Sequence, residues 1–238
     1  MLFWIYSTFR SFDGEVNCFY QGAPTLFIRF AGCNMNPPCS YCDTLYAHRK
    51  RQGKRMLVNS LLRYVDNSYP FFNKATITGG EPLFQKDGLL ELIVKLKREG
   101  KRVSVETNGS LPIPMQKDVA PDCWVVDYKL PSSGAHRKMD KDNFGKLRPC
   151  DWVKFVVASK EDYQFALKVM EEYDDFEHCN VAFSPMIPLK RGRGGRGGPS
   201  VLANWMLRDN VFAVFNLQIH KYIWPEIYFK KKGKVEEH

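Results

Sequence analysis

Three cysteines lie within the short segment Cys33-Asn-Met-Asn-Pro-Pro-Cys39-Ser-Tyr-Cys42, directly after the apolar run at 26–30. Three thiolates on one loop can bind three irons of an iron–sulfur cube and leave the fourth iron for a small molecule. A structural zinc ion is the alternative, because it takes four ligands and His48 could be the fourth. The spacing favours the cluster but leaves both sites open.

A second motif, Thr76-Ile-Thr-Gly-Gly-Glu-Pro82, ends another strand-like run with two glycines and a carboxylate. In folds built on parallel strands, ligands bind at the carboxyl ends of the strands. Gly79 and Gly80 would let the backbone approach a ligand closely, and Glu81 could pair with an ammonium group. Taken alone, Gly-Gly-Glu-Pro could be an ordinary turn. One βα unit after a three-cysteine loop, it indicates a cofactor site.

The chain between these motifs alternates strand-like and helical segments, which predicts an α/β fold with a parallel sheet. Six runs dense in Val, Ile, Phe or Trp are the expected core strands: Leu26–Phe30, Ala75–Thr78, Val103–Glu106, Trp124–Tyr128, Trp152–Val157 and Asn180–Phe183. A seventh strand is expected at Val211–Leu217. Apolar spacing of 3.6 residues predicts helices at Leu57–Val65, Gly88–Arg98 and Glu161–Tyr173. Residues 131–150 contain little helical pattern, so the outer helical layer is expected to be incomplete there.

Composition predicts one globular domain over residues 1–238. The 238 residues are 44% hydrophobic and 26% charged, which excludes wholesale disorder and a collagen-like chain. No apolar run is long enough to cross a bilayer, and the apolar start lacks a basic flank, so we expect neither a membrane span nor a signal peptide and a cytoplasmic location. Two segments are expected to differ from the rest, a mobile Arg/Gly-rich loop at 190–199 and a basic, polar tail at 230–238.

The net charge of +9 would permit a nucleic-acid partner, but much of the excess lies in short local runs that are usually solvated. Direct nucleic-acid binding is therefore not expected. Seven cysteines without an export signal favour metal or redox chemistry over a disulfide framework. The four cysteines outside the loop are widely scattered and are expected to be mostly small apolar core residues: Cys18, Cys123, Cys150 and Cys179.

Together, the cysteine loop and Gly-Gly-Glu-Pro resemble the radical S-adenosylmethionine (SAM) superfamily, whose usual loop is C-x3-C-x2-C with an aromatic residue before the last cysteine. Tyr41 matches that aromatic residue, whereas the first gap here has five residues.

Further motifs resemble the 7-carboxy-7-deazaguanine synthase family, in the family's order, over nearly the whole chain. They are Phe12-Asp-Gly-Glu15, Arg29-Phe-Ala-Gly-Cys33-Asn, Cys42-Asp-Thr44, Val105-Glu-Thr-Asn-Gly109, Asp127-Tyr-Lys-Leu-Pro-Ser-Ser-Gly134 and Leu217-Gln-Ile-His-Lys-Tyr222. Two departures stand out: Asp13-Gly-Glu-Val16 replaces the usual Gln-Gly-Glu-Gly, and Ser184 replaces a common Gln, so Ser184 is left out of the expected site.

The resemblance implies a partial (β/α)6-type barrel with an incomplete outer helical layer. It also implies a carbon–nitrogen lyase that converts 6-carboxy-5,6,7,8-tetrahydropterin to 7-carboxy-7-deazaguanine with loss of ammonia, on the route to queuosine-type deazapurines. A four-iron, four-sulfur cluster on Cys33, Cys39 and Cys42 would reduce SAM to give the radical that takes a hydrogen from the pterin. The resemblance also implies an Mg²⁺ ion at Thr44. It further implies a one-electron reductant, such as flavodoxin or ferredoxin, and a homodimer.

Two sets of binding residues follow from the same resemblance. The expected SAM-binding residues are Tyr41, Gly79, Gly80, Glu81, Glu106, Asn108, Lys129 and Ser132. The expected pterin-binding residues are Asp13, Gly14, Glu15, Arg29, Gln218 and His220. Pattern alone also permits structural roles, with Glu106 and Asn108 in a strand that enters a turn, His220 as a satisfied strand residue, and the Thr44 hydroxyl as a turn cap.

Two other functions stay open from the residues. A glycyl-radical activase would share the cysteine loop and Gly-Gly-Glu-Pro but would not need Glu15, Arg29 and His220. A zinc-stabilised RNA-binding module could use the basic charge and the Arg-Gly-Gly loop, but would have no use for Gly-Gly-Glu-Pro.

Overall fold

The computed structural model describes residues 1–172, 176, 178–187 and 198–225. In this part of the chain nine strands form one sheet, in the order β3-β1-β2-β4-β5-β6-β7-β8-β9. The strands are β1 (Leu2–Phe12), β2 (Pro24–Phe30), β3 (Lys54–Leu57), β4 (Lys74–Gly79), β5 (Arg102–Thr107), β6 (Cys123–Tyr128), β7 (Trp152–Val157), β8 (Asn180–Pro185) and β9 (Val214–Phe215).

The six expected core strands form the parallel centre of the sheet, from β2 through β8, which confirms the partial barrel. The expected seventh strand is reduced to the two residues of β9, parallel to β8. Sequence reasoning missed β1 and β3, which pair antiparallel at the other edge of the sheet. β1 begins with the apolar run at 2–6, and most of its residues are half-buried.

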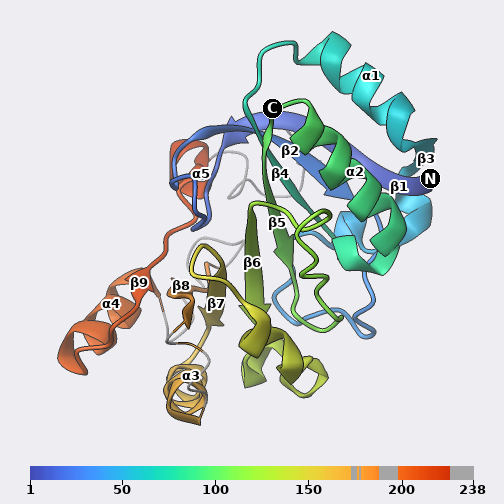
Figure 1. Cartoon of the computed structure of the whole chain (residues 1–238). Helices are drawn as coiled ribbons and strands as arrows, with labels where there is room; N and C mark the ends of the chain where they lie inside the picture. Colours follow the sequence, from blue (N-terminus) through green and yellow to red (C-terminus); the bar gives the residue numbers. More distant parts are fainter. Residues whose placement is uncertain (173–175, 177, 188–197, 226–238) are drawn as a thin grey trace.

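Five α-helices lie in the described residues: α1 (Val58–Ser68), α2 (Lys86–Arg98), α3 (Lys160–Glu172), α4 (Pro199–Arg208) and α5 (His220–Ile223). The first three confirm the expected helices. In Figure 1, α1 and α2 lie beside the N-terminal strands, and α3 and α4 lie near β7 and β8. Between β6 and β7 the chain forms only short 3-10 turns, so the helical layer is incomplete there as expected.

The described residues bear on three further expectations, which concern His220, the two unusual segments and a membrane span. His220 is not a strand residue, because it is the first residue of α5. The Arg/Gly-rich loop up to residue 197 and the tail at 230–238 lie outside the described residues. Among the helices described, none has both the length and the apolar character that a bilayer crossing requires.

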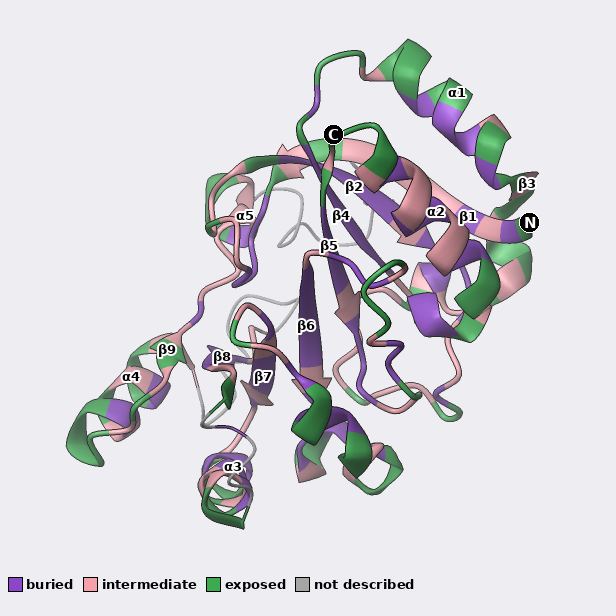
Figure 2. Ribbon diagram, in the orientation of Figure 1, coloured by how far each residue is buried: buried purple, intermediate pink, exposed green. Residues whose placement is uncertain are grey.

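The pleat of the central strands separates apolar from polar side chains. Successive residues of a strand point to opposite faces, and the outward positions are fully buried beneath helices and turns: Ile28, Ile77, Val105, Val126 and Phe155. The strands β5 and β6 are accordingly buried along most of their length in Figure 2. The next or preceding residue in each strand points into the barrel and is polar or charged: Arg29, Thr78, Glu106, Asp127 and Lys154. The barrel interior is therefore a polar cavity.

Glycines at the end of β4 bring that strand against the start of the cysteine loop. A Cβ atom on Gly79, whose φ is +139°, would lie 2.2 Å from the Phe30 carbonyl oxygen, and one on Gly80 would lie 2.3 Å from the Gly32 carbonyl oxygen. The Gly80 amide donates to the Phe30 carbonyl (3.1 Å), and the Glu81 amide donates to the Gly32 carbonyl (2.8 Å). Both glycines are thus required by backbone packing, whatever ligand they also contact.

Gly79→Ala is expected to lower the free energy of unfolding by about 3 kcal/mol or more, because a left-handed backbone and a backbone clash add together. Gly100→Ala is the matched control. Gly100 also has a positive φ, +72°, but a Cβ there would meet nothing within 4 Å. That variant should lose only about 1 kcal/mol. Urea unfolding of both variants measures the difference, and equal losses would contradict the packing argument.

Candidate active site inside the barrel

A cavity of about 510 Å³ occupies the barrel interior, a size typical of small-molecule sites. Every expected site residue contributes to its wall except Asp13, Glu81 and Ser132. Those at the wall are Gly14, Glu15, Arg29, Cys33, Cys39, Tyr41, Cys42, Thr44, Gly79, Gly80, Glu106, Asn108, Lys129, Gln218 and His220. Residues from position 14 to position 220 are thus brought to one cavity.

The cysteine loop forms one side of the cavity, and its three thiols are free and half-buried. The Met35 amide donates to Cys33 Sγ at 3.5 Å, and Cys42 Sγ lies 3.5 Å from Thr44 Oγ1. Burial, with a smaller contribution from the charges of Glu81 and the neighbouring cysteines, raises the pKa of Cys33 to about 11. Thiolates at this position therefore need a cationic partner such as iron.

The described residues do not form a ready-made zinc site. Within the described ranges, no three His, Cys, Asp or Glu side chains gather closely enough to surround one metal ion. Zinc bonds of about 2.3 Å would bring tetrahedral thiolates within about 3.8 Å of one another, whereas a cube gives each thiolate its own iron and holds them farther apart. His48, the expected fourth zinc ligand, has Nε2 only 2.8 Å from the Met35 carbonyl oxygen.

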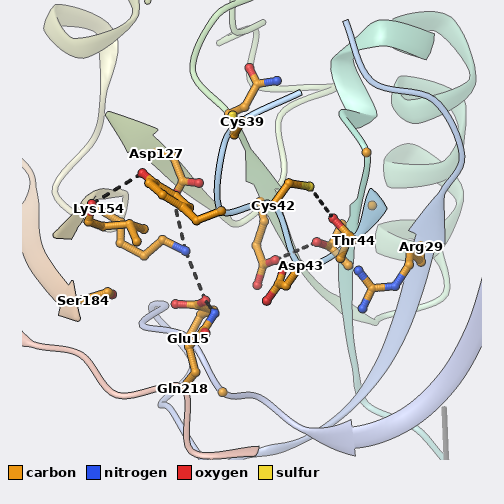
Figure 3. Close-up of a pocket in the computed structure, with 18 of the residues that line it drawn as sticks. Glu15, Arg29, Cys39, Cys42, Asp43, Thr44, Asp127, Lys154, Ser184 and Gln218 are labelled. Atoms are coloured by element: carbon orange, nitrogen blue, oxygen red, sulfur yellow. Dashed lines mark hydrogen bonds and ion pairs between the residues drawn. The ribbon is translucent and has the colours of Figure 1, made fainter. Parts of the chain in front are cut away.

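A charged group forms another side of the cavity, centred on Lys154. Its Nζ lies 3.1 Å from Glu15 Oε1 and 3.1 Å from Asp127 Oδ1, and its side chain is only 8% exposed. Burial opposes the charge, but Asp127 and Glu15 raise the pKa of Lys154 above its ordinary value. Figure 3 shows these three side chains together, across the cavity from Cys42 and Thr44. Sequence reasoning missed Lys154, although a lysine inside the apolar run Trp152–Val157 signals a buried charge that requires partners.

Residues after β9 donate hydrogen bonds to Glu15. Glu15 accepts hydrogen bonds from Asn216 Nδ2 (2.7 Å) and Gln218 Nε2 (2.5 Å). Asn216 Nδ2 also donates to Ser184 Oγ (2.7 Å), and Gln21 Nε2 donates to Asn216 Oδ1 (2.8 Å). Ser184 does line the cavity, although the family's pattern led us to leave it out. Asn216 was missed because a buried amide carries no signal in sequence.

The three expected residues outside the wall have protein partners. Glu81 is fully buried and accepts from the Leu83 amide (2.9 Å), Thr107 Oγ1 (2.7 Å) and the Asn108 amide (2.7 Å), so it ties the end of β4 to the end of β5. Asp13 accepts from Thr76 Oγ1 (2.8 Å) and pairs with Lys74. The exposed Ser132 donates its amide to Asp162 Oδ1 (2.9 Å).

Thr44 lies beside the cysteine loop at the cavity wall. It precedes a 3-10 turn at Leu45–Ala47, and its hydroxyl makes no capping hydrogen bond there. The neighbouring Asp43 carboxylate lies 2.8 Å from Lys221 Nζ. Burial raises the pKa of Asp43, but the Lys221 ammonium outweighs it and lowers that pKa to about 2. The turn-cap alternative for Thr44 is thus not what the structure shows.

Comparison with known proteins agrees with this geometry. The model of the radical SAM superfamily matches residues 27–121. A 7-carboxy-7-deazaguanine synthase of Koribacter versatilis is 34% identical over 227 residues, covering 92% of this chain and 96% of the relative. One from Clostridium acetobutylicum is 36% identical over 222 residues, covering 91% and 93%. The chain belongs to the 7-carboxy-7-deazaguanine synthase family.

The fold of this family member also resembles a solved structure. The crystal structure of QueE from Escherichia coli superposes with a TM-score of 0.68 at 18% identity, covering 91% of this chain and 95% of that one. Membership in the synthase family favours the synthase over the activase and over the RNA-binding module, both of which the residues alone left open.

His220 of this synthase-family chain is held neutral in the folded state. A Cβ on Gly14 would lie 1.8 Å from His220 Nδ1, so the ring packs directly on the glycine. Burial lowers the pKa of His220 to about 4 from an ordinary 6.5. Between these pH values the unfolded chain binds a proton that the folded chain does not, so His220 makes stability fall as pH drops from 6.5 to 4.

His220→Gln is expected to reduce the loss of stability between pH 6.5 and pH 4, because glutamine has no proton to gain. Urea unfolding of both proteins at several pH values measures the effect, and nuclear magnetic resonance of the ring gives the pKa directly. A ring that titrates near its ordinary 6.5 would contradict the burial argument.

Proposed function

We propose that the protein is a radical SAM lyase that converts 6-carboxy-5,6,7,8-tetrahydropterin to 7-carboxy-7-deazaguanine with loss of ammonia. The observation that carries this function is that the three-cysteine loop and the Glu15–Lys154–Asp127 group share one cavity. The two relatives compared above align with this chain over more than nine-tenths of their length, and both are named 7-carboxy-7-deazaguanine synthase.

Cys33, Cys39 and Cys42 would hold the iron–sulfur cluster. When bound, the cluster supplies the electron that cleaves SAM to a 5′-deoxyadenosyl radical. Other residues that line the cavity around the loop would bind and orient the cosubstrate: Tyr41, Gly79, Gly80, Glu106, Asn108 and Lys129.

Two expected SAM contacts need a revised role. The Glu81 carboxylate already accepts three hydrogen bonds and lies behind the wall, so it positions the Asn108 backbone instead of meeting the amine directly. Ser132 would contribute only if the bound complex brought it closer, because it lies outside the wall.

The pterin would occupy the inner part of the cavity. Glu15 offers a carboxylate, oriented by Asn216 and Gln218, to the guanidine-like edge of the ring. Arg29 provides the positive charge for the substrate carboxylate, and the neutral His220 can exchange only hydrogen bonds with it. Asp13 orients Lys74 beneath this group and does not reach the substrate.

A turnover assay tests the proposal. Anaerobically reconstituted protein is incubated with SAM, a one-electron reductant, Mg²⁺ and the tetrahydropterin, and mass spectrometry and an ammonia assay follow the products. We expect one ammonia for each 7-carboxy-7-deazaguanine formed. Cleavage of SAM with the pterin unchanged would overturn the synthase and favour an activase.

Thr44→Val is expected to raise the Mg²⁺ concentration needed for half-maximal turnover, because the variant keeps the shape and removes the oxygen. A single hydroxyl is a weak ligand, so substrate and water oxygens must complete an octahedron at about 2.0 to 2.1 Å. Thr44→Ser, which keeps the hydroxyl, is the matched control. Unchanged Mg²⁺ dependence in Thr44→Val with full iron content would remove Thr44 from the proposed metal site.

The reductant, the oligomeric state and the location of the protein stay predictions from the sequence. We expect a flavodoxin- or ferredoxin-type reductant, a homodimer and a cytoplasmic location. Sedimentation of the reconstituted protein tests the dimer.

A further inference from the structure

Three cysteines outside the cysteine loop lie together at the start of β6. The Cys18 amide donates to Cys123 Sγ (3.4 Å) across 105 residues of sequence, and Cys123 Sγ lies 3.2 Å from the Cys150 carbonyl oxygen. Although they are widely separated in sequence, strand pairing brings their loops together. The expectation that most of these cysteines are core residues holds for Cys123, which is fully buried, and for Cys18 and Cys179, which pack partly buried against core clusters.

Cys18 and Cys123 are joined by the hydrogen bond from the Cys18 amide to Cys123 Sγ, and Cys18 Sγ lies 3.9 Å from the carbonyl oxygen of Asp122, the residue before Cys123. The Cys150 thiol also points to the Asp122 carbonyl oxygen, 3.4 Å away. A disulfide requires Cβ atoms about 3.8 Å apart, and the Cys18 backbone already lies within hydrogen-bond distance of the Cys123 sulfur.

The two cysteines differ in access. Cys123 is fully buried in a small cluster inside the barrel with Val16, Val125 and Ala182. Cys18 is half-buried and lines a surface hollow that also contains Lys97, Lys101, Arg102 and Asp122. The neighbouring Cys123 thiol lowers the pKa of the Cys18 thiol, against the opposing effects of burial and of the Asp122 charge, and a lower pKa favours the reactive thiolate. An oxidant from solvent thus meets Cys18 first.

We propose that Cys18 and Cys123 are a redox-sensitive dithiol that a small disulfide, such as oxidised glutathione, converts to an intramolecular disulfide. The Cys18 thiolate attacks one sulfur of the small disulfide, which forms a mixed disulfide and releases one small thiol. The Cys123 thiol, losing its proton, then attacks Cys18 Sγ and releases the second small thiol. Two protein thiols are oxidised, one small disulfide is reduced to two thiols, and no oxygen is consumed.

The Cys18–Cys123 disulfide would restrain the loop that contains Glu15. Cys18 follows Glu15 by three residues, and Asn17 Nδ2 already donates to the Glu15 carbonyl (3.0 Å). Cys123 is the first residue of β6, which also carries Asp127. The disulfide therefore links the Glu15 loop covalently to the strand that holds Asp127.

The test uses the reconstituted holoenzyme under argon, in buffers of graded reduced-to-oxidised glutathione ratio. Remaining thiols are then alkylated, and peptides are mapped without reduction. We expect a Cys18–Cys123 peptide, loss of alkylation at both residues and unchanged iron content. Cys150→Ser should keep this peptide, whereas Cys18→Ser should lose it and leave Cys123 alkylated after unfolding.

Three results would overturn the proposal. They are a Cys18–Cys150 peptide in the wild-type protein, a mixed glutathione disulfide at Cys18 that persists in the wild-type protein although Cys123 is present, and cross-linking that appears only with urea. Hydrogen exchange gives a second measurement, because the disulfide should slow exchange of the amides at 16–19 in the folded holoenzyme. The wild-type map decides the outcome even if a buried Cys123→Ser variant fails to fold.

Discussion

Cys42→Ala is expected to abolish the broad iron–sulfur absorbance at about 400 nm and all turnover. Alanine at Cys33 or Cys39 should have the same effect. Each thiol would bind a different iron, and no other cysteine among the described residues lines the cavity to replace it. Iron content, electron paramagnetic resonance after reduction and the absorbance spectrum measure the loss.

Cys179→Ala is the matched control, because Cys179 packs partly buried against the core and away from the cavity. It should retain full iron content. Stoichiometric zinc with no iron after anaerobic reconstitution of the wild-type protein would refute the cluster.

Lys154→Met is expected to reduce both stability and turnover strongly. Removing this ammonium leaves Glu15 and Asp127 with less compensation inside the barrel. Loss of one partner from a buried ion pair costs about 3 to 5 kcal/mol. Steady-state kinetics should show at least about a hundredfold loss of kcat/KM, equivalent to about 2.7 kcal/mol.

Lys146→Met removes an exposed lysine and is the control. It should unfold at the wild-type urea concentration and keep wild-type turnover. If Lys154→Met unfolded at the same urea concentration as this control, the ion pairs would contribute nothing to stability.

The central strands could be predicted because each is dense in apolar residues, as in Trp152–Val157. The same runs concealed the cavity, because the direction of a polar residue within them, such as Lys154 or Thr78, depends on the pleat. Attention to the period of two would have identified Thr78 and Glu106 as neighbours on the inner face. β1 was missed because its apolar run, at 2–6, was considered only as a possible membrane span or signal peptide.

Contacts between distant segments could not be predicted from local pattern. Asn216 meets Glu15 across 201 residues, and Cys18 meets Cys123 across 105. Such pairs depend on which strand edges lie side by side. His220 and Glu106 were identified only through the resemblance to a family, since the spacing around them is ordinary.

The two sides of the cavity come from very different times in synthesis of the chain. The cysteine loop needs β2 and the end of β4, which are complete by residue 81. The Glu15 side needs Asn216 and Gln218, which leave the ribosome last among the described wall-forming segments. The thiol loop and its supporting strands are therefore synthesised before the residues that orient Glu15. The order of translation would allow the cluster to be loaded before a pterin could be enclosed.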